Sequence, residues 1–564
     1  MTKLKITACV AVLAMAVACN KGDFLDKTAT SDLTERSVFS DSARTMEFLT
    51  GIYADIAYSF NPFRFGGAGL ESASDEAEGP GSNSSSAYIQ WAAGSINSNA
   101  WVVGDAWNTS YANIRRVNVF FKYLPVSPFA NALKTNAKAE ARFLRAWYYF
   151  NLVKHYGGVP LVGDTIYTGD SPIRVERRSF EDCINYIVSE LNTAIPDLLP
   201  TQFSNNYGRI TSGAARALKA RVLLYAASPL FNGAQTATEE PLRSITGYPT
   251  ADPERWRLAA AAAKEVMDLN LYKLNEDNST APGYGFYKLF TLRKNDEHIL
   301  QGMRNKNREL EGMWLPPSRS AGDGANPTKE MADAFPMRNG KAITEAGSGY
   351  DPTHPYDNRD PRFNYSIIHN ESLVWINNGP KQPVYTYVGM PQDAIYIGTN
   401  TGFYINKMLQ EDVVPNNFTE TERCFPLIRY AEILLNYAEA LNEADGAVPE
   451  VYAAVEAIRK RAGLDPYQLP AGLTKDQMRT AIQAERRIEL AFEEHRFWDV
   501  RRWKIAPQTD NKTMHGTEIT KNGGSYSYQT INVRPHVFRD AMYLWPLPQG
   551  ELSKSPELLQ NPGW

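Results

Sequence analysis

The sequence predicts a mostly α-helical protein, in which a helical-repeat scaffold (an α-α superhelix) carries a loop-rich region with short strands. Three observations support this fold class. Apolar residues recur every three or four positions in blocks on both sides of residues 275–425, which is the period of amphipathic helices. Small and aromatic residues interleave on these faces, so paired helices can approach closely. Residues 275–425 themselves are rich in Gly, Pro, Asn and Tyr.

Residues 41–270 form the predicted N-terminal helical region. Phe143, Ala146, Trp147 and Phe150 make one apolar stripe, and the helix that carries them should end at Gly157-Gly158. Two further helices have start signals. Ser212 is a candidate cap for one of them, and Asp252-Pro253 supplies a cap and a first-turn proline for the other.

Residues 271–564 form the predicted C-terminal region, in which helices return after the loops. We expect helices at 429–443, 451–461 and about 475–503. The first two make a pair of the size of a tetratricopeptide unit, although the full repeat signature is not met. Helix pairs from both ends of the chain can therefore stack into one scaffold. The insertion at 275–425 should carry short extended runs such as 384–388, and long loops on a rigid frame are common places for binding sites.

The N-terminus has the pattern of an export signal. Lys3 and Lys5 precede an apolar run from 6 to 17, which is too short for a spanning helix of roughly 20 residues. The run ends in Ala16-Val17-Ala18-Cys19, which looks like a bacterial lipobox. We therefore expect a signal peptide at 1–18, acylation of Cys19, and a tether over 19–40. The alternative is a soluble secreted protein in which the cysteine occurs by chance.

Composition narrows the partners and the redox chemistry. Loss of Lys3 and Lys5 with the leader changes the formal charge from -4 to about -6, which disfavours nucleic acid. Only Cys183 and Cys424 remain for a disulfide, and two buried thiols are the commoner alternative. Aromatic residues make up 12% of the chain, including 30 Tyr and 11 Trp. This exceeds what a helical core needs, so some rings should be exposed.

Seven passages, in this order, resemble the SusD/RagB family of outer-membrane nutrient-binding lipoproteins. They are Leu224–Asn232, Asn326–Thr328 with Ala334-Phe335, Arg359–Phe363, Arg429–Ala440, Ile458–Leu464, Glu485–Arg487 through His495–Asp499, and Gln560–Trp564. The resemblance implies four tetratricopeptide-like helix pairs and capture of oligosaccharides, or in some members peptides, at the cell surface. It also implies a partner, a SusC-like TonB-dependent transporter barrel in the outer membrane. The passages 359–362 and 485–499 alternate charges with rings, which suits buried ion pairs.

Candidate ligand residues lie in residues 61–104 and in the insertion. A sugar site needs flat rings to stack on and polar groups for the hydroxyl rim. Candidates in the first stretch are Asp75, Glu76, Asn83, Tyr88, Trp91, Asn97, Asn99 and Trp101; those in the insertion are Trp314, Tyr284 and Tyr287. We expect Trp91 and Trp314 to contribute most, and Trp375 less. For each ring the alternative is a side chain packed under a loop.

Metal binding and catalysis find little support in the sequence. The seven His are scattered, without H-E-x-x-H or zinc spacing, and no cofactor is expected. Asp75, Glu76 and Glu78 suggest a calcium site, with a solvated acidic loop as the better alternative. A glycosidase would need two carboxylates about 5 to 10 Å apart, which no pattern identifies. We expect a binding protein and no enzyme; a scaffold that binds only proteins is the third alternative.

Overall fold

The computed structural model describes residues 35–57, 69–79, 87–168, 174–202, 206–233, 236–322, 324–376, 379–410 and 421–564. The expected leader, Cys19 and Asn83 lie outside these ranges. Within them, no helix combines the length and the apolar character that crossing a membrane requires.

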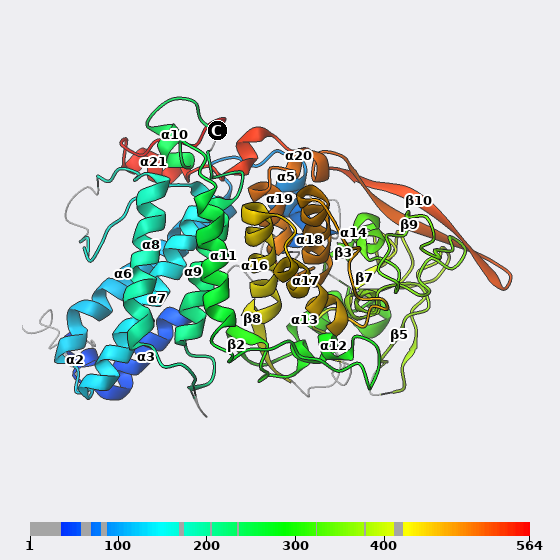
Figure 1. Ribbon diagram of the computed structural model, residues 1–564, viewed down its shortest axis with the longest axis horizontal. Helices are drawn as coiled ribbons and strands as arrows, with labels where there is room; N and C mark the ends of the chain where they lie inside the picture. The colour runs from blue at the N-terminus through cyan, green and yellow to red at the C-terminus, as the bar shows by residue number, and fades with distance from the viewer. Residues whose placement is uncertain are drawn as a thin grey trace, which may run out of the picture.

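The N-terminal half is a stack of long helices (Figure 1). Each helix contacts the one that follows it in the series α3 (Ser42–Tyr53), α6 (Trp101–Tyr123), α7 (Asn131–Tyr156), α8 (Phe180–Ala194), α9 (Ser212–Ala227) and α11 (Glu254–Met267). The stripe predicted on α7 is buried at all four positions, Phe143, Ala146, Trp147 and Phe150. The mostly α-helical fold predicted from periodicity is therefore confirmed.

Helix starts follow the predicted signals within one residue. The cap of α9 is Thr211 rather than Ser212, because the Thr211 side chain accepts a hydrogen bond from the backbone N–H of Ala214. Before α11, the Asp252 carboxylate accepts from the backbone N–H of Glu254 at 2.9 Å. Both contacts satisfy amides that have no partner inside the helix.

The C-terminal helices continue the same stack. They are α16 (Tyr430–Asp445), α17 (Pro449–Arg461), α18 (Lys475–Glu489) and α19 (His495–Arg502). Because α16 packs against both α11 and α17, helices from the two ends of the chain form one scaffold, as predicted. The single helix expected over 475–503 is wrong, since Phe492 and Glu494 adopt positive φ angles of 58° and 61° and separate α18 from α19.

Between these halves the elements are short, as predicted. The helical ones are α12 (Tyr284–Thr291), α13 (Glu309–Trp314), α14 (Lys329–Ala334) and α15 (Arg362–Ser366). The strands β2 (His298–Asn307) and β8 (Thr421–Arg429) pair antiparallel, as do β5 (Leu373–Val374) and β6 (Gln382–Pro383). Residues 384–388, expected to be extended, lie just after β6 and form no strand.

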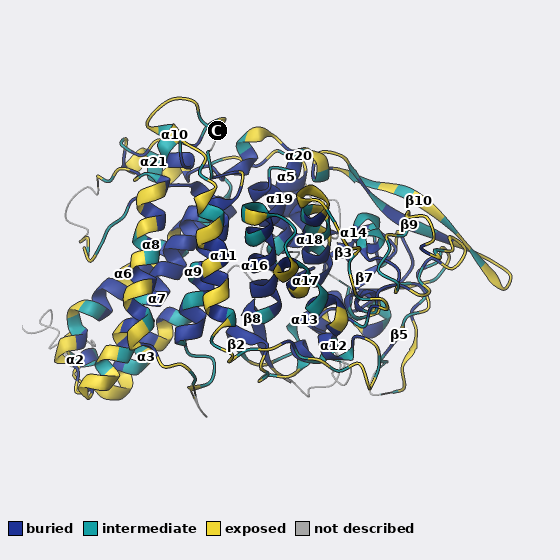
Figure 2. Ribbon diagram, in the orientation of Figure 1, coloured by how far each residue is buried: buried dark blue, intermediate teal, exposed yellow. Residues whose placement is uncertain are grey.

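A long hairpin lies outside the predicted strand region. Its strands β9 (Thr513–Asn522) and β10 (Ser525–Pro535) pair antiparallel around a tight turn at Gly523 and Gly524. The hairpin projects at the end of the molecule opposite the long helices (Figure 1). Residues 520–525, at the tip of the hairpin, are exposed (Figure 2).

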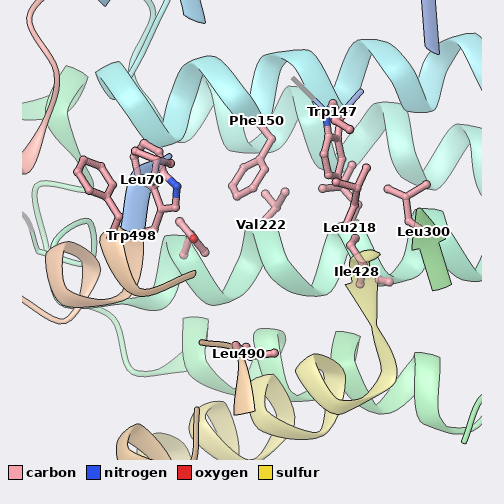
Figure 3. Close-up of a cluster of buried hydrophobic side chains, with 14 of the residues drawn as sticks. Leu70, Trp147, Phe150, Leu218, Val222, Leu300, Ile428, Leu490 and Trp498 are labelled. Carbon is pink, nitrogen blue, oxygen red and sulfur yellow. The ribbon is translucent and has the colours of Figure 1, made fainter. Parts of the chain in front are cut away.

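The core joins the helical stack to the central strands. Two helices and two strands meet in the cluster that Figure 3 shows. The helices contribute Trp147 and Phe150 from α7 and Leu218 and Val222 from α9, and the strands contribute Leu300 from β2 and Ile428 from β8. Trp498 lies at one end of the cluster. Aromatic and branched side chains thus meet across elements far apart in sequence, which is how burial stabilises a fold of this size.

A buried ion-pair network ties the insertion to the C-terminal helices. Arg362, fully buried, contacts Asp360 at 2.7 Å, Glu485 at 2.6 Å and Glu489 at 2.8 Å. The same Glu489 binds Arg429 at 2.6 Å and also pairs with Arg461. The break after α18 places Glu493 beside Arg429, at 2.7 Å. The prediction of structural ion pairs in 359–362 and 485–499 is confirmed.

The last residues of the chain pack against α7. The Asn561 side chain donates to the backbone carbonyls of Tyr156, at 3.0 Å, and of Trp545, at 2.6 Å. Arg177 donates to the Asn561 side chain at 2.9 Å. The Trp564 indole donates to the carbonyls of Ala541 and Leu544. The C-terminal segment is therefore a structural part of the N-terminal helices.

The two remaining cysteines are free and buried. The Cys183 thiol lies 3.5 Å from the carbonyl of Val159, and the Cys424 thiol lies 3.4 Å from that of Arg293. Burial raises the pKa of each thiol to about 12. The disulfide alternative is therefore wrong, and the alternative of two buried thiols is confirmed.

Candidate ligand-binding surface

Trp91 belongs to the core rather than to an exposed site. Its ring is 1% exposed and packs against Phe497, with centroids 5.6 Å apart, and Trp545, at 4.8 Å. The Arg501 guanidinium lies 5.8 Å from its centroid. The expectation of an exposed ring at Trp91 is wrong, because α5 (Ala87–Ala92) carries it inward onto C-terminal residues that no local pattern reveals.

Tyr88 and Trp314 are also buried, at 1% and 3% exposure. A Cβ atom placed on Gly79 would lie 2.2 Å from the Tyr88 ring, and one on Gly324 would lie 2.8 Å from Trp314. Gly79 and Gly324 therefore leave the space that the two rings occupy, because any larger side chain at either position would overlap them. The expectation that Tyr88 and Trp314 face a ligand as exposed rings is therefore wrong in this structure.

The acidic residues at 75–78 are buried and point to different partners. Asp75 binds Arg496 through both carboxylate oxygens, at 2.7 and 2.8 Å, and Arg487 at 2.9 Å. Burial favours the neutral form of Asp75, but the two arginines outweigh it and hold its pKa well below the usual value. Asp75 is therefore a buried structural anion, and its interpretation as an exposed ligand contact is wrong.

Glu78 and Glu76 have opposite surroundings. Glu78 contacts Arg534 at 2.8 Å and His536 at 2.7 Å. Both carboxylate oxygens of Glu76 lack a hydrogen-bond partner in the described ranges, and burial, then Asp75, raises its pKa to about 8. No group of three or more candidate metal ligands occurs in the described ranges. The alternative of a solvated acidic loop is also wrong, because all three acids are buried.

The other predicted residues of 61–104 fall outside this buried group or cannot be placed. Asn97 and Asn99 are exposed beside the start of α6. Trp101 opens α6, and its side chain lies outside the described part, as does Asn83. Trp375 follows β5 and is half-buried. Their contact with a ligand stays a prediction.

Tyr284 and Tyr287, unlike Trp91, Tyr88 and Trp314, remain at the surface. Both are half-buried on α12, with centroids 5.6 Å apart, and Tyr287 stacks on Tyr365 of α15 at 5.8 Å and 23°. Gly283 starts α12 with φ 70°, and a Cβ there would lie 2.8 Å from the carbonyl of Ala462. We name Tyr284, Tyr287 and Tyr365 the α12 tyrosine cluster.

Polar groups surround the α12 tyrosine cluster. Asn364 is exposed next to Tyr365; its side chain contacts His369 at 3.1 Å, and its backbone carbonyl accepts from the Asn406 side chain at 2.8 Å. The Lys288 ammonium lies 6.0 Å from the centroids of Tyr284 and Tyr287. Burial lowers the pKa of His369 to about 4, so this ring is neutral at pH 7. Rings, amides and one cation together can stack on and hydrogen-bond a sugar.

A second ring cluster was not predicted. Tyr385 and Tyr387 lie 5.6 Å apart, and Tyr387 lies 5.8 Å from Tyr526 of β10. The Lys521 ammonium lies 5.2 to 6.0 Å from all three rings, and the Tyr526 hydroxyl donates to Glu371 at 2.9 Å. We name Tyr385, Tyr387 and Tyr526 the hairpin tyrosine cluster. Tyrosines at alternate positions in both segments were the available signal.

Two family models match different parts of the chain. A family model described as the SusD family matches residues 288–564, and one described as "Starch-binding associating with outer membrane" matches residues 23–224. The chain is 26% identical over 444 residues to SusD-like protein P2 of Formosa agariphila, covering 76% of this chain and 75% of that protein. It is 30% identical over 178 residues, 31% of each chain, to a SusD-like protein of Bacteroides ovatus.

Solved structures share the fold. A SusD-like protein from Bacteroides fragilis superposes with a TM-score of 0.77 at 26% identity, covering 94% of this chain and 98% of that one. A laminarin-binding SusD-like protein gives a TM-score of 0.60 at 23% identity, covering 93% and 100%, which is a likeness of fold. The helical stack, the matching passages and these comparisons lead to one conclusion: the chain belongs to the SusD/RagB family of carbohydrate-binding, outer-membrane-associated proteins.

Proposed function

We propose that this protein captures oligosaccharides at the cell surface and delivers them to a SusC-like TonB-dependent transporter. The observation that carries the proposal is the α12 tyrosine cluster, three half-buried rings with amide groups beside them. Sugar rings present apolar C–H faces that stack on such rings, and their hydroxyls pair with amides. The family description names starch binding, and one structural relative is named for laminarin binding.

Anchoring and partner are parts of the same proposal. Acylation of Cys19 would hold the chain at the outer membrane, facing the exterior, since each buried methylene contributes about 0.8 kcal/mol. The family description associates its members with that membrane. A binding protein that stays at the surface needs a transporter to pass on its cargo, and the resemblance supplies the SusC-like barrel. The mechanism is equilibrium capture followed by transfer.

Calorimetric titration tests the ligand class. The mature chain, purified in detergent, is titrated with neutral α-glucan and β-glucan hexasaccharides, with a uronic acid hexasaccharide and with a peptide mixture. The double variant Tyr284→Ala, Tyr287→Ala should bind the preferred glycan about fivefold to 150-fold more weakly, because each of the two stacked rings contributes about 0.5 to 1.5 kcal/mol. Tyr526→Ala, in the hairpin tyrosine cluster, is the matched control.

The outcomes separate the alternatives. Binding of peptides alone would replace glycan capture with peptide capture, and binding of neither would favour a scaffold that contacts only proteins. If glycan binds and Tyr526→Ala alone weakens it, the ligand class stands and the site moves to the hairpin tyrosine cluster. Co-purification of the barrel with the wild-type chain tests delivery, and a chain that assembles with no transporter contradicts it.

A further inference from the structure

A cavity lies on the helical side of the molecule, away from both tyrosine clusters. It has a volume of about 750 Å³, within the roughly 300 to 1,000 Å³ typical of small-molecule sites. Helices α16 and α18 and the first turn of α11 contribute to its lining, and the loops at 229–233, 251–253 and 503–505 supply the rest of it, apart from Ala227 at the end of α9. Figure 1 shows where these three helices lie in the stack. We name it the α11–α18 pocket. It shares no lining residue with either tyrosine cluster.

Two tryptophans from different elements line this pocket. Trp256, in the first turn of α11, is half-buried, and Trp503 caps the end of α19. The Trp503 indole donates to the Glu439 carboxylate at 2.7 Å, which fixes the orientation of the ring. Flat rings that are held in place before binding lose little conformational freedom when a ligand stacks on them. Such walls suit the C–H face of a sugar.

Among the pocket's lining residues, Asn442 carries an acceptor that has no partner in the part of the chain that the structure describes. Asn442 of α16 is 0% exposed, and its amide nitrogen donates to the carbonyl of Lys475 at 3.0 Å. Its side-chain oxygen has no hydrogen-bond partner in the described ranges, although Asn442 lines the pocket. Buried carbonyl oxygens are normally paired. A ligand hydroxyl donating to this oxygen would satisfy it.

The charges that line the pocket balance. Glu443 accepts from Arg479 through both oxygens and lies 3.6 Å from Lys475. Glu439 is paired with Arg502 and Trp503. The remaining charged lining residues, Asp252 and Lys504, are of opposite sign. No excess of either sign is left to bind an ion, so a neutral ligand fits better than an acidic or basic one.

We propose that the α11–α18 pocket is a second carbohydrate site, which binds the end of a neutral oligosaccharide. One sugar ring stacks on Trp256, and a hydroxyl donates to the side-chain oxygen of Asn442. Gln483, at the rim, offers both a donor and an acceptor for further hydroxyls. The proposal rests on glycan capture as the function and adds a site that the tyrosine clusters do not form.

Binding in a background without the α12 tyrosine cluster tests the second site. The mature chain with Tyr284→Ala and Tyr287→Ala is titrated with neutral α-glucan and β-glucan hexasaccharides and with a uronic acid hexasaccharide. Residual binding of a neutral hexasaccharide is expected, and adding Trp256→Ala should weaken it at least fivefold. Leu258→Ala, at an exposed position of the same helix that does not line the pocket, should change it less than twofold. Asn442→Leu removes the acceptor and should have the effect of Trp256→Ala.

Hydrogen exchange locates the ligand independently. In the same background, saturating neutral hexasaccharide should slow amide exchange at 475–483, the part of α18 that lines the pocket, by at least threefold. If Asn442→Leu does not fold, Trp256→Ala and the exchange measurement still decide the matter. Loss of all binding in the tyrosine background, with wild type binding, overturns the second site and leaves the proposed function intact. Absence of glycan binding to wild type overturns both, and selective uronic acid binding overturns the neutral-ligand argument.

Discussion

Single side chains in residues 71–78 show how environment decides the state of a carboxylate. Asp75 lies beside two arginines and stays ionised, whereas its neighbour Glu76 has no hydrogen-bond partner in the described part of the chain. Both are buried. The difference is therefore the presence of a cation within contact distance, which outweighs the cost of desolvation for Asp75 and is missing for Glu76.

The raised pKa of Glu76 makes stability depend on pH. Its pKa is about 8 in the folded chain against a usual value of 4.5. Between pH 4.5 and pH 8 the folded state therefore keeps a proton on Glu76 that the unfolded state has lost. Raising the pH from 5 to 8 therefore lowers the free energy of unfolding, and this contribution is fully present only below pH 4.5. Glu76→Gln does not titrate, and its advantage over wild type should grow to about 1 to 3 kcal/mol at pH 8.

Thermal unfolding at pH 5, 6.5 and 8 measures this advantage. The exposed Glu47→Gln serves as the control and should follow wild type at every pH. A difference between Glu76→Gln and wild type that is the same at pH 5 and pH 8 would show that Glu76 is ionised in the folded state.

Residue-level prediction from sequence failed where partners are distant in the chain. Trp91 lies in a Gly/Ser-rich stretch with no helical period, which predicts an exposed ring, yet its partners are Phe497 and Trp545 near the other end of the chain. Local composition carries no information on such contacts. The Gly/Pro composition around Tyr284 and Tyr287 predicts a loop, and the structure leaves both rings half-buried at the surface because the short helix α12 buries its other side. Their role in binding stays a prediction.

At the scale of elements, periodicity and capping signals predicted the long helices well. The failure at 475–503 has a physical reason: the apolar pattern continues through 490–494, but α18 has to end so that Glu493 reaches Arg429. Tertiary ion pairs override local helix preference there. The hairpin β9–β10 was missed because its strands are mostly polar and β10 has no fully buried residue, so the two strands lack the apolar alternation that identifies half-buried strands.

The start of α18 gives a prediction at this scale. Thr474 and Gln477 form a capping box, in which each side chain accepts a hydrogen bond from the backbone N–H of the other. Thr474→Ala leaves helix amides unpaired and should reduce the free energy of unfolding by about 1 kcal/mol. Thr480→Ala, on the exposed face of the same helix, is the control. In urea unfolding, equal midpoints for both variants would contradict a role for this cap.

For the whole molecule, the buried ion-pair network links the loop-rich region to the helical scaffold. Five of its members, Asp360, Arg362, Arg429, Arg461 and Glu489, are almost completely buried. Such a network adds little net stability compared with an apolar core, but removing one partner leaves charges without compensation. It therefore fixes where the insertion sits on α17 and α18, and with it the position of the α12 tyrosine cluster.

Arg362→Met tests that link. The variant leaves Asp360, Glu485 and Glu489 without one cation and should lose about 3 to 5 kcal/mol of unfolding free energy. Arg116→Met removes a half-exposed pair with Asp55 and should lose no more than about 1 kcal/mol. Chemical denaturation of both variants gives the comparison. A loss at Arg362 no larger than at Arg116 would mean that the network is not needed to hold the insertion in place.

The contacts of the C-terminal segment with α7 set the order of events during biogenesis. Asn561 and Tyr156 are 405 positions apart in the chain, and contacts of such long range slow folding because loop closure must come first. Because synthesis begins at the N-terminus, α7 cannot make its contacts with residues 545–564 until those residues exist. The packing at the end of α7, around Tyr156, is therefore among the last parts of the fold to be completed.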